Sequence, residues 1–257
     1  MTPQNGSEPT PMAEMVPEVA RSLGLGNHST PTRLSQVSDV ERERRRVQYL
    51  EEQEQTEQRN RDTAWHMLVR EIGRRYVDCR LSTFEAVTDA QKEAKATLDK
   101  FCEEIVQRTE SGQGLVFTGP KGTGKDHLAV ACLRVAVLFH GIRADWIDGQ
   151  ALYQEFRDNI DSESSELQMV RQYTAPKILL ISDPVPHTEN LTAFQQSVLW
   201  RIIDRRYRNM TPTWVTMNVA TAEEAEKRIG SQIVDRLRDG ALSIVCNWPS
   251  HRKKATN

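Results

Sequence analysis

The sequence lacks the features that mark membrane, secreted and zinc-bearing proteins. Its four cysteines are scattered along the chain, and no two of them form a CxxC pair. This scatter argues against a zinc site and against a disulfide framework. No apolar run is long enough to span a membrane, and the N-terminus has no signal-peptide pattern. We therefore expect a cytoplasmic protein that needs neither zinc nor a membrane.

An excess of charge of one sign is also lacking. The 257 residues carry a formal net charge of −2 at pH 7, with 34 Lys and Arg against 36 Asp and Glu. No global basic field points to nucleic acid, so any DNA-binding surface must be local. The length allows one sizeable domain and a smaller attachment.

A glycine-rich loop with the spacing of a phosphate-binding loop lies near the middle of the chain. It follows a short apolar run, residues 115–117, which is typical of a buried parallel strand, and it precedes an apolar helical pattern. Its glycines let backbone amides surround phosphate oxygens, and its final lysine would reach the terminal phosphates of a nucleotide. The predicted nucleotide-binding residues are Gly119, Pro120, Lys121, Gly122, Thr123, Gly124, Lys125, Asp126 and His127.

One residue departs from the P-loop pattern. Ser or Thr normally follows the lysine and its hydroxyl ligates Mg²⁺, whereas Asp126 stands there in this chain. A carboxylate can bind Mg²⁺, but it can also repel phosphate or pair with Lys125. The sequence therefore supports binding of ATP and Mg²⁺ more strongly than it supports hydrolysis.

A second apolar strand, residues 178–182, runs into an acid and resembles a Walker B strand, whose carboxylates hold Mg²⁺. If Asp183 is the second acid of the Walker B pair, Ser182 stands at the first position. If Asp183 is the first acid, Pro184 takes the water-activating position. One carboxylate is missing in both alignments, and an ordinary core strand is the alternative. The candidate metal ligands are Asp126, Ser182 and Asp183, and Asp183 is also a candidate catalytic residue.

Two further polar residues are candidates for catalysis. Asn218 follows the strand at 213–217, where an amide can hold the attacking water, although Asn is also a common turn residue at strand ends. Arg236 is a candidate arginine finger, which would stabilise transferred phosphoryl charge and can be worth about 10³–10⁵ in rate. The alternative for Arg236 is a helix-end arginine that compensates the helix dipole.

Strands and helices alternate through the rest of the chain, which predicts an α/β, three-layer P-loop sandwich with a mainly parallel five-stranded sheet. The predicted strands are residues 115–118, 143–147, 178–182, 213–217 and 242–246. The predicted helices between and after them are residues 125–140, 149–159, 165–173, 191–208 and 221–238.

Three regions are expected along the chain. Residues 1–38 are rich in Pro, Ser and Thr and are predicted to be a mostly disordered tail. Residues 39–75 form a charged helical region, which ends in an amphipathic stretch around Trp65 and Ile72. Residues 76–257 form the nucleotide-binding domain, which opens with an irregular lead-in and a helix over 89–109.

Four stretches together resemble the DnaC-type replicative helicase loaders, in the DnaC/DnaI/IstB branch of the AAA+ ATPases. They are residues 122–129 (Gly-Thr-Gly-Lys-Asp-His-Leu-Ala), the strand that ends at Asn218, residues 235–240 (Asp-Arg-Leu-Arg-Asp-Gly) and residues 247–252 (Asn-Trp-Pro-Ser-His-Arg). The resemblance covers roughly residues 74–252. Loaders of this type tolerate a residue without a hydroxyl after the P-loop lysine.

The resemblance also implies individual roles. Lys125 corresponds to the Walker A lysine, Asn218 to sensor 1, Arg236 to the arginine finger and Arg252 to sensor 2, which contacts the nucleotide. Ser182 departs from the Walker B pair of the family.

The function that the resemblance implies is ATP-dependent loading of the replicative DNA helicase. In this family an N-terminal helical region grips the helicase hexamer, while AAA+ domains self-associate and engage single-stranded DNA. Residues 1–75 would be the counterpart here, although they do not match the family residue by residue. Stacking aromatics with nearby cations suit single-stranded DNA, and the candidates are Phe156, Arg157 and Phe194. Core packing is the alternative for each of them.

Two other functions fit the same residues. An IstB-like transposition helper shares the fold and the ATP site but remodels a DNA–transposase complex, and the ending at 247–252 favours the loader over it. A nucleotide-gated adaptor that scarcely hydrolyses ATP is favoured by Asp126 and Ser182.

Overall fold

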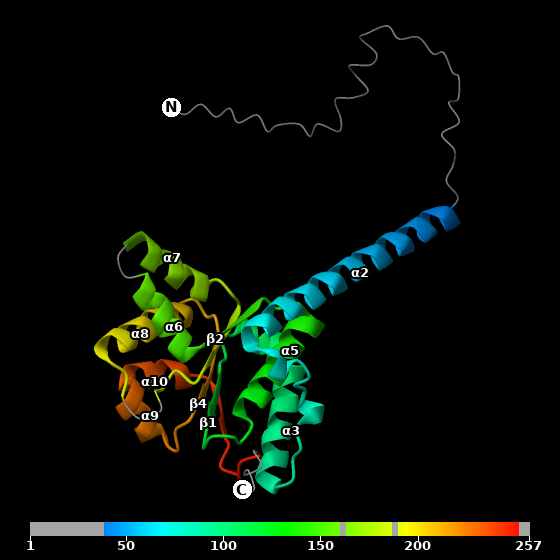
Figure 1. Ribbon diagram of the computed structural model, residues 1–257. Helices are drawn as coiled ribbons and strands as arrows, with labels where there is room; N and C mark the ends of the chain where they lie inside the picture. The colour runs from blue at the N-terminus through cyan, green and yellow to red at the C-terminus, as the bar shows by residue number, and fades with distance from the viewer. Residues whose placement is uncertain (1–38, 160–162, 187–189, 252–257) are drawn as a thin grey trace, which may run out of the picture. The chain divides into compact units, whose positions relative to one another are not determined.

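The computed structural model describes residues 39–159, 163–186 and 190–251 (Figure 1). The predicted tail over residues 1–38 and the sensor-2 candidate Arg252 lie outside these ranges. The chain divides into two units between Leu50 and Glu51, and the second unit contains the sheet. No helix in the described part is long and apolar enough to cross a membrane.

A five-stranded parallel sheet forms the centre of the second unit. The strands are β1 (Leu115–Thr118), β2 (Ala144–Asp148), β3 (Ile178–Ser182), β4 (Thr213–Met217) and β5 (Leu242–Val245). They lie in the order β2-β3-β4-β1-β5, and every pairing is parallel. All strands therefore end at the same edge, which brings together the polar residues that follow them. The predicted parallel sheet is confirmed.

Helices cover both faces of the sheet (Figure 1). Because side chains alternate along a strand, Leu115 and Phe117 enter one apolar cluster while Val116 enters the other. The first cluster packs against α3 (Asp89–Glu103), α4 (Ile105–Glu110) and α5 (Lys125–His140). The second packs against α6 (Gly149–Asp158), α7 (Glu163–Thr174), α8 (Ala193–Arg208), α9 (Ala222–Ile229) and α10 (Ser231–Arg238). The predicted three-layer sandwich is therefore confirmed.

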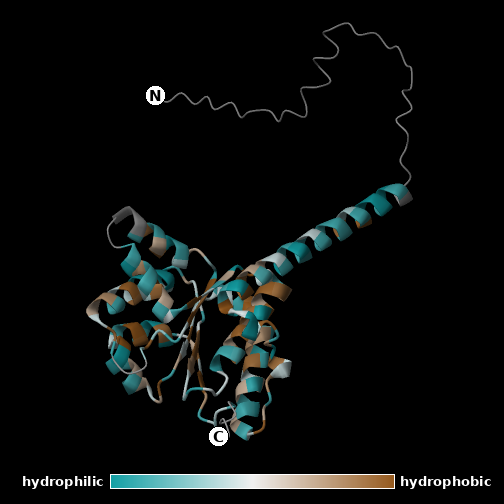
Figure 2. Cartoon of the chain, in the orientation of Figure 1, coloured by the Kyte–Doolittle hydropathy of each residue, from teal (hydrophilic) through white to brown (hydrophobic). Residues whose placement is uncertain are grey.

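One long helix, α2 (Asp39–Ile72), covers the whole region that the sequence divides into a charged and an amphipathic part. Residues 41–60 are all exposed, and Figure 2 shows most of the helix as hydrophilic. Near its end, Trp65, Leu68 and Ile72 are buried in the first apolar cluster. The helix stops at Gly73, and two short 3₁₀ helices, η1 (Arg74–Tyr76) and η2 (Leu81–Thr83), form the irregular lead-in.

Two predicted helices are each two helices in the structure. The helix predicted over 89–109 breaks at Glu104, where α3 ends and α4 begins. The helix predicted over 221–238 breaks at Gly230, whose φ of 99° lies in a region that favours glycine. Both predictions were wrong because helical periodicity continues across a local turn. The other elements between residues 115 and 245 begin and end within two residues of the predicted bounds.

A buried arginine holds together the starts of two strands that lead to the site. Arg206 on α8 is fully buried, and burial lowers the pKa of its guanidinium to about 9. It donates hydrogen bonds to the carbonyl oxygens of Tyr173, Pro176, Lys177 and Pro212 and to Oγ1 of Thr213. Because buried charges need such partners, Arg206 fixes how β3 and β4 enter the sheet.

Candidate functional site

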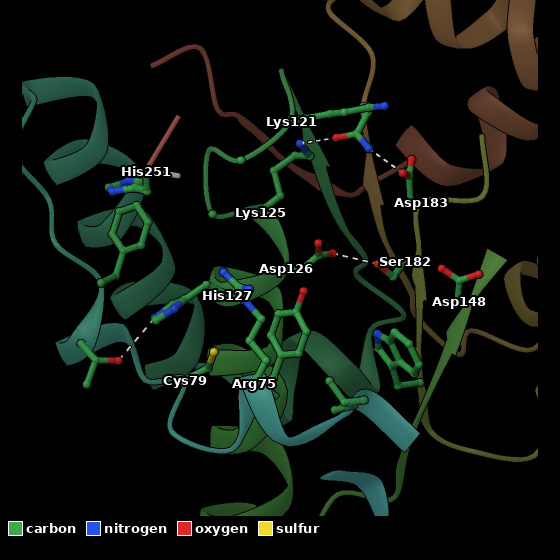
Figure 3. A pocket seen from close by; sticks show the side chains of 18 of the residues that line it. Arg75, Cys79, Lys121, Lys125, Asp126, His127, Asp148, Ser182, Asp183 and His251 are labelled. Carbon is green, nitrogen blue, oxygen red and sulfur yellow. Dashed lines mark hydrogen bonds between the residues drawn. The ribbon is translucent and has the colours of Figure 1, made fainter. Parts of the chain in front are cut away.

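A pocket of about 750 Å³ lies where β3 and β4 end and α5 begins (Figure 3). It brings together most of the residues that the sequence marks as candidates for nucleotide, metal and catalysis. Those that line it are Lys121, Gly122, Gly124, Lys125, Asp126, His127, Ser182, Asp183 and Asn218. Carboxyl ends of parallel strands are where α/β proteins place their ligands.

The loop over residues 119–125 has the backbone that its glycines allow. Gly119 has a φ of 135°, and a Cβ there would lie 2.3 Å from the carbonyl oxygen of Cys246. Gly124 has a φ of 91° and directly precedes α5. Gly124, Lys125 and Asp126 line the pocket, so the N-terminus of α5 opens onto it, and the positive end of the helix dipole suits an anion.

Lys125 is buried at the pocket wall, with a relative exposure of 5%. Its Nζ donates hydrogen bonds to the carbonyl oxygens of Gly119 at 3.0 Å and Pro120 at 2.8 Å, and to Oδ1 of Asn218 at 2.8 Å. Nδ2 of Asn218 in turn donates to Oδ2 of Asp183 at 2.5 Å. The P-loop lysine, the residue after β4 and the residue after β3 thus form one connected chain (Figure 3).

Asp126 is held by two hydroxyl groups. Oγ of Ser182 donates to Oδ1 of Asp126 at 2.9 Å, and Oγ1 of Thr216 donates to the same oxygen at 2.7 Å. Ser182 and Thr216 are register partners on β3 and β4, so the sheet sets the two hydroxyls side by side. Ser182 thus faces the residue after the P-loop lysine, whereas Asp183, at a φ of 48°, contacts Asn218.

The donors in the pocket fit magnesium. Magnesium is usually bound by one or two carboxylates together with hydroxyl, water and phosphate oxygens. The pocket supplies the carboxylates of Asp126 and Asp183 and the hydroxyl of Ser182. Among the described residues no three His, Cys, Asp or Glu side chains gather as a metal-binding group, so a metal here would rely on mixed oxygen donors.

Several pocket residues were not singled out from the sequence. Arg75, Tyr76, Cys79 and Phe84 come from the segment after α2, which lacks any periodic pattern. Burial raises the pKa of the Cys79 thiol to about 11. Asp148 ends β2 and also lines the pocket, and its Oδ1 caps α6 by accepting from the amides of residues 150 and 151. A strand-end acid before a helix was the one available signal for Asp148.

The C-terminal segment, residues 247–251, forms hydrogen bonds with the backbone of the P-loop. Nε1 of Trp248 donates to the carbonyl oxygen of Thr123 at 2.8 Å, and the amide of His251 donates to the carbonyl oxygen of Gly122 at 2.8 Å. His251 also lines the pocket. The Asn-Trp-Pro-Ser-His stretch, noticed only as a family signature, therefore has a structural role in shaping the loop.

Arg236 lies elsewhere. It is on α10, with its guanidinium 4.4 Å from the ring centroid of Tyr207 and its Nε 3.8 Å from Oδ1 of Asp204. It is not among the described residues that line the nucleotide pocket. Arg236 therefore lies outside the group of candidate residues that the pocket brings together.

The three DNA-contact candidates differ in exposure. Phe156 is buried and stacks on Tyr173, with ring centroids 6.3 Å apart, so it has the core-packing role that was its alternative. Phe194 is half-buried against the second apolar cluster, and Arg157 is exposed.

Comparison with known proteins agrees with the fold and the motifs. The family model described as IstB-like ATP binding protein matches residues 32–257. The replicative helicase loader DnaC of Escherichia coli (strain K12) is 27% identical over 181 residues, which cover 70% of this chain and 71% of that protein. The resemblance inferred from the motifs is confirmed.

Solved structures show the same fold. The crystal structure of the DnaC helicase loader aligns with a TM-score of 0.59 and 26% identity over 67% of this chain and 99% of that one. The crystal structure of the DnaI aligns with a TM-score of 0.56 and 18% identity over 70% of this chain and 94% of that one. At that lower identity the likeness concerns the fold alone.

Proposed function

The chain belongs to the IstB-like ATP binding protein family, and on that premise we propose that it is an ATP-dependent loader of a replicative DNA helicase. The observation that carries the proposal is the connected chain of Lys125, Asn218 and Asp183 in a P-loop pocket. It occurs in a fold that aligns with nearly the whole of the DnaC helicase loader structure.

ATP would bind with its phosphates against the backbone amides of residues 121–125, at the N-terminus of α5. The ammonium group of Lys125 would give up one of its present acceptors for a terminal phosphate oxygen. Arg252, the sensor-2 counterpart, follows the segment that binds the P-loop and would contact the same nucleotide. His127 lines the pocket, and its Nε2 lies 3.0 Å from the carbonyl oxygen of Arg80, which orients it toward the lead-in.

Hydrolysis would use the residues at the ends of β3 and β4. The Asn218 amide would hold the attacking water, while Asp183 fixes that amide through its hydrogen bond. Magnesium, held by Asp126, Ser182 and Asp183, would neutralise phosphate charge when bound. Arg236 would act on the nucleotide of a neighbouring subunit, which makes self-association of the AAA+ domains part of the mechanism.

Partner binding would be divided along the chain. Residues 1–38 and the charged helical region 39–75 would contact the helicase hexamer, and residues 76–257 would form the ATPase domain. Single-stranded DNA would meet Arg157 on α6 and Phe194 on α8, whereas Phe156 stays packed against Tyr173 in the core. A cytoplasmic location goes with this role.

A loading assay tests the proposal. The hexameric replicative helicase of the chain's own host is mixed with this protein, Mg-ATP and circular single-stranded DNA, and helicase bound to the circles is counted after a salt wash. We expect binding to rise with this protein and to fall back to the background level with Lys125→Ala. Helicase recovery unchanged by the wild-type protein would contradict the proposal.

The family match itself favours one second candidate, an IstB-like transposition helper. A helper of this kind would use the same ATP site of this chain, so only the partner separates the two functions. Capture of a transposase–DNA complex, with no effect on the helicase, would favour the helper.

A further inference from the structure

We infer that the carboxylate and the hydroxyl that serve Mg²⁺ in a P-loop protein have exchanged places in this chain. Asp126 on the P-loop helix would be the carboxylate ligand, and Ser182 at the end of β3 would be the hydroxyl partner. The inference rests on the proposed nucleotide site and identifies the side chain that makes nucleotide binding depend on metal.

The exchange is visible in the positions of the two residues. In P-loop NTPases the residue after the lysine is Ser or Thr, and the Walker B strand supplies the Asp. Here the acid follows Lys125, and the hydroxyl ends β3. The two side chains still face each other, with Ser182 Oγ 2.9 Å from Asp126 Oδ1. The pair has kept its chemistry and reversed its order along the chain.

The Asp126 carboxylate is fixed for binding through one of its oxygens. Ser182 and Thr216 are buried, with exposures of 8% and 1%, and both hydroxyls donate to Oδ1. Buried hydroxyls need such an acceptor, so they hold the carboxylate in place. In the described chain the hydrogen bonds of Asp126 all use Oδ1, and the residue lines the pocket, which leaves Oδ2 for a cation.

The charges around α5 make a cation necessary. Asp126 lies in the first turn of α5, where the helix dipole stabilises a negative charge. Phosphates bound at the same helix end would bring further negative charge close to that carboxylate. A divalent cation held by Asp126 would offset this repulsion. We therefore expect nucleotide binding to depend on metal more strongly than it would with a hydroxyl after Lys125.

Two other roles for Asp126 predict different behaviour. If it only ties α5 to β3 and β4, its replacement by Asn, which keeps an acceptor oxygen for both hydroxyls, leaves nucleotide affinity unchanged. If it only repels phosphate, the same replacement tightens nucleotide binding equally with and without metal. If Asp126 and Ser182 have exchanged roles, Asp126→Asn instead changes the ratio of the nucleotide affinity with metal to the affinity without metal.

The test measures dissociation constants of a fluorescent ADP analogue for the full chain, in Mg²⁺ and in EDTA. We expect wild type to bind about tenfold or more weakly in EDTA, a usual strength for coupled ligands. Asp126→Asn should bring the EDTA and Mg²⁺ values close together. The double variant Asp126→Ser with Ser182→Asp, which restores the usual order, should recover the wild-type ratio.

Asp148→Asn is the matched control. It removes another carboxylate from the same pocket, and Asn still caps a helix well. This variant should keep the wild-type ratio. Electron paramagnetic resonance of Mn²⁺ gives a direct readout, because wild type and the double variant should remove free Mn²⁺ signal in the presence of ADP and Asp126→Asn should not.

The outcomes distinguish failure of the exchanged pair from failure of the proposed nucleotide site. An unchanged ratio in Asp126→Asn, or a ratio lost only in Asp148→Asn, would overturn the exchange while leaving nucleotide binding intact. ADP that fails to bind wild type in both buffers would instead remove the proposed nucleotide site itself.

Discussion

The indole Nε1 of Trp248 donates a 2.8 Å hydrogen bond to the carbonyl oxygen of Thr123, inside the P-loop. The two residues are 125 positions apart in the sequence, and both are buried. A loop of glycines has many conformations available, and this bond from outside selects one of them. The C-terminal segment therefore supports the proposed nucleotide site, although Trp248 does not line the pocket.

Trp248→Phe should lower both stability and nucleotide affinity. Phe keeps much of the apolar volume but leaves the Thr123 carbonyl without its donor, which costs about 1–3 kcal/mol for a buried group. Urea unfolding gives the stability, and titration with Mg-ADP gives the affinity.

Trp200→Phe is the control for that substitution. Trp200 is half-buried against the other apolar cluster, on the opposite face of the sheet. Its replacement should leave ADP affinity at the wild-type value. Equal losses of affinity in both variants would show that Trp248 acts only through general stability.

The sequence was sufficient where the signal is local. The apolar runs locate all five strands, and the glycine spacing at residues 119–125 locates the P-loop, because these patterns depend on neighbouring residues. Thr216 was missed because its partner Asp126 lies 90 residues away and only the β3–β4 register joins them. The buried hydrogen bonds of Arg206 were missed for the same reason.

An arginine finger that acts between subunits can be tested by mixing two inactive variants. Arg236→Ala and Lys125→Ala should each hydrolyse little ATP alone. Mixed in equal amounts, about a quarter of the interfaces would join an intact P-loop to an intact Arg236, given a head-to-tail assembly. In a phosphate-release assay, the mixture should therefore hydrolyse ATP at about a quarter of the wild-type rate.

Arg238→Ala, two residues further along α10 and exposed, is the control and should keep wild-type hydrolysis. The contacts of Arg236 with Tyr207 and Asp204 offer a purely structural role. In that case Arg236→Ala would melt at a lower temperature, and mixing would restore nothing.

The Cys79 thiol should react slowly at ordinary pH. Burial raises its pKa from 9.0 to about 11, so at pH 8 its thiolate fraction is about a hundredfold below that of the unfolded chain. Because the folded-state pKa is the higher one, the neutral thiol favours folding below pH 9, and this contribution is lost as the pH rises toward 11.

Mass spectrometry of the Cys79 peptide after iodoacetamide treatment checks this expectation. Labelling should be slow at pH 8, faster as the pH approaches 11, and rapid at pH 8 in urea. If the folded protein is labelled as fast as the urea-unfolded chain, the Cys79 thiol is exposed to solvent and the expectation is wrong.

The proposed loader function requires that this pocket hydrolyses ATP, and we propose that single-stranded DNA changes the rate of hydrolysis. The most direct measurement is ATP hydrolysis by the purified full chain with Mg²⁺, with and without single-stranded DNA, beside Lys125→Ala. We expect ATP turnover that changes when single-stranded DNA is added and that disappears in Lys125→Ala. Tight ATP binding without turnover in any of these conditions would contradict it and would identify the protein as a nucleotide-gated adaptor.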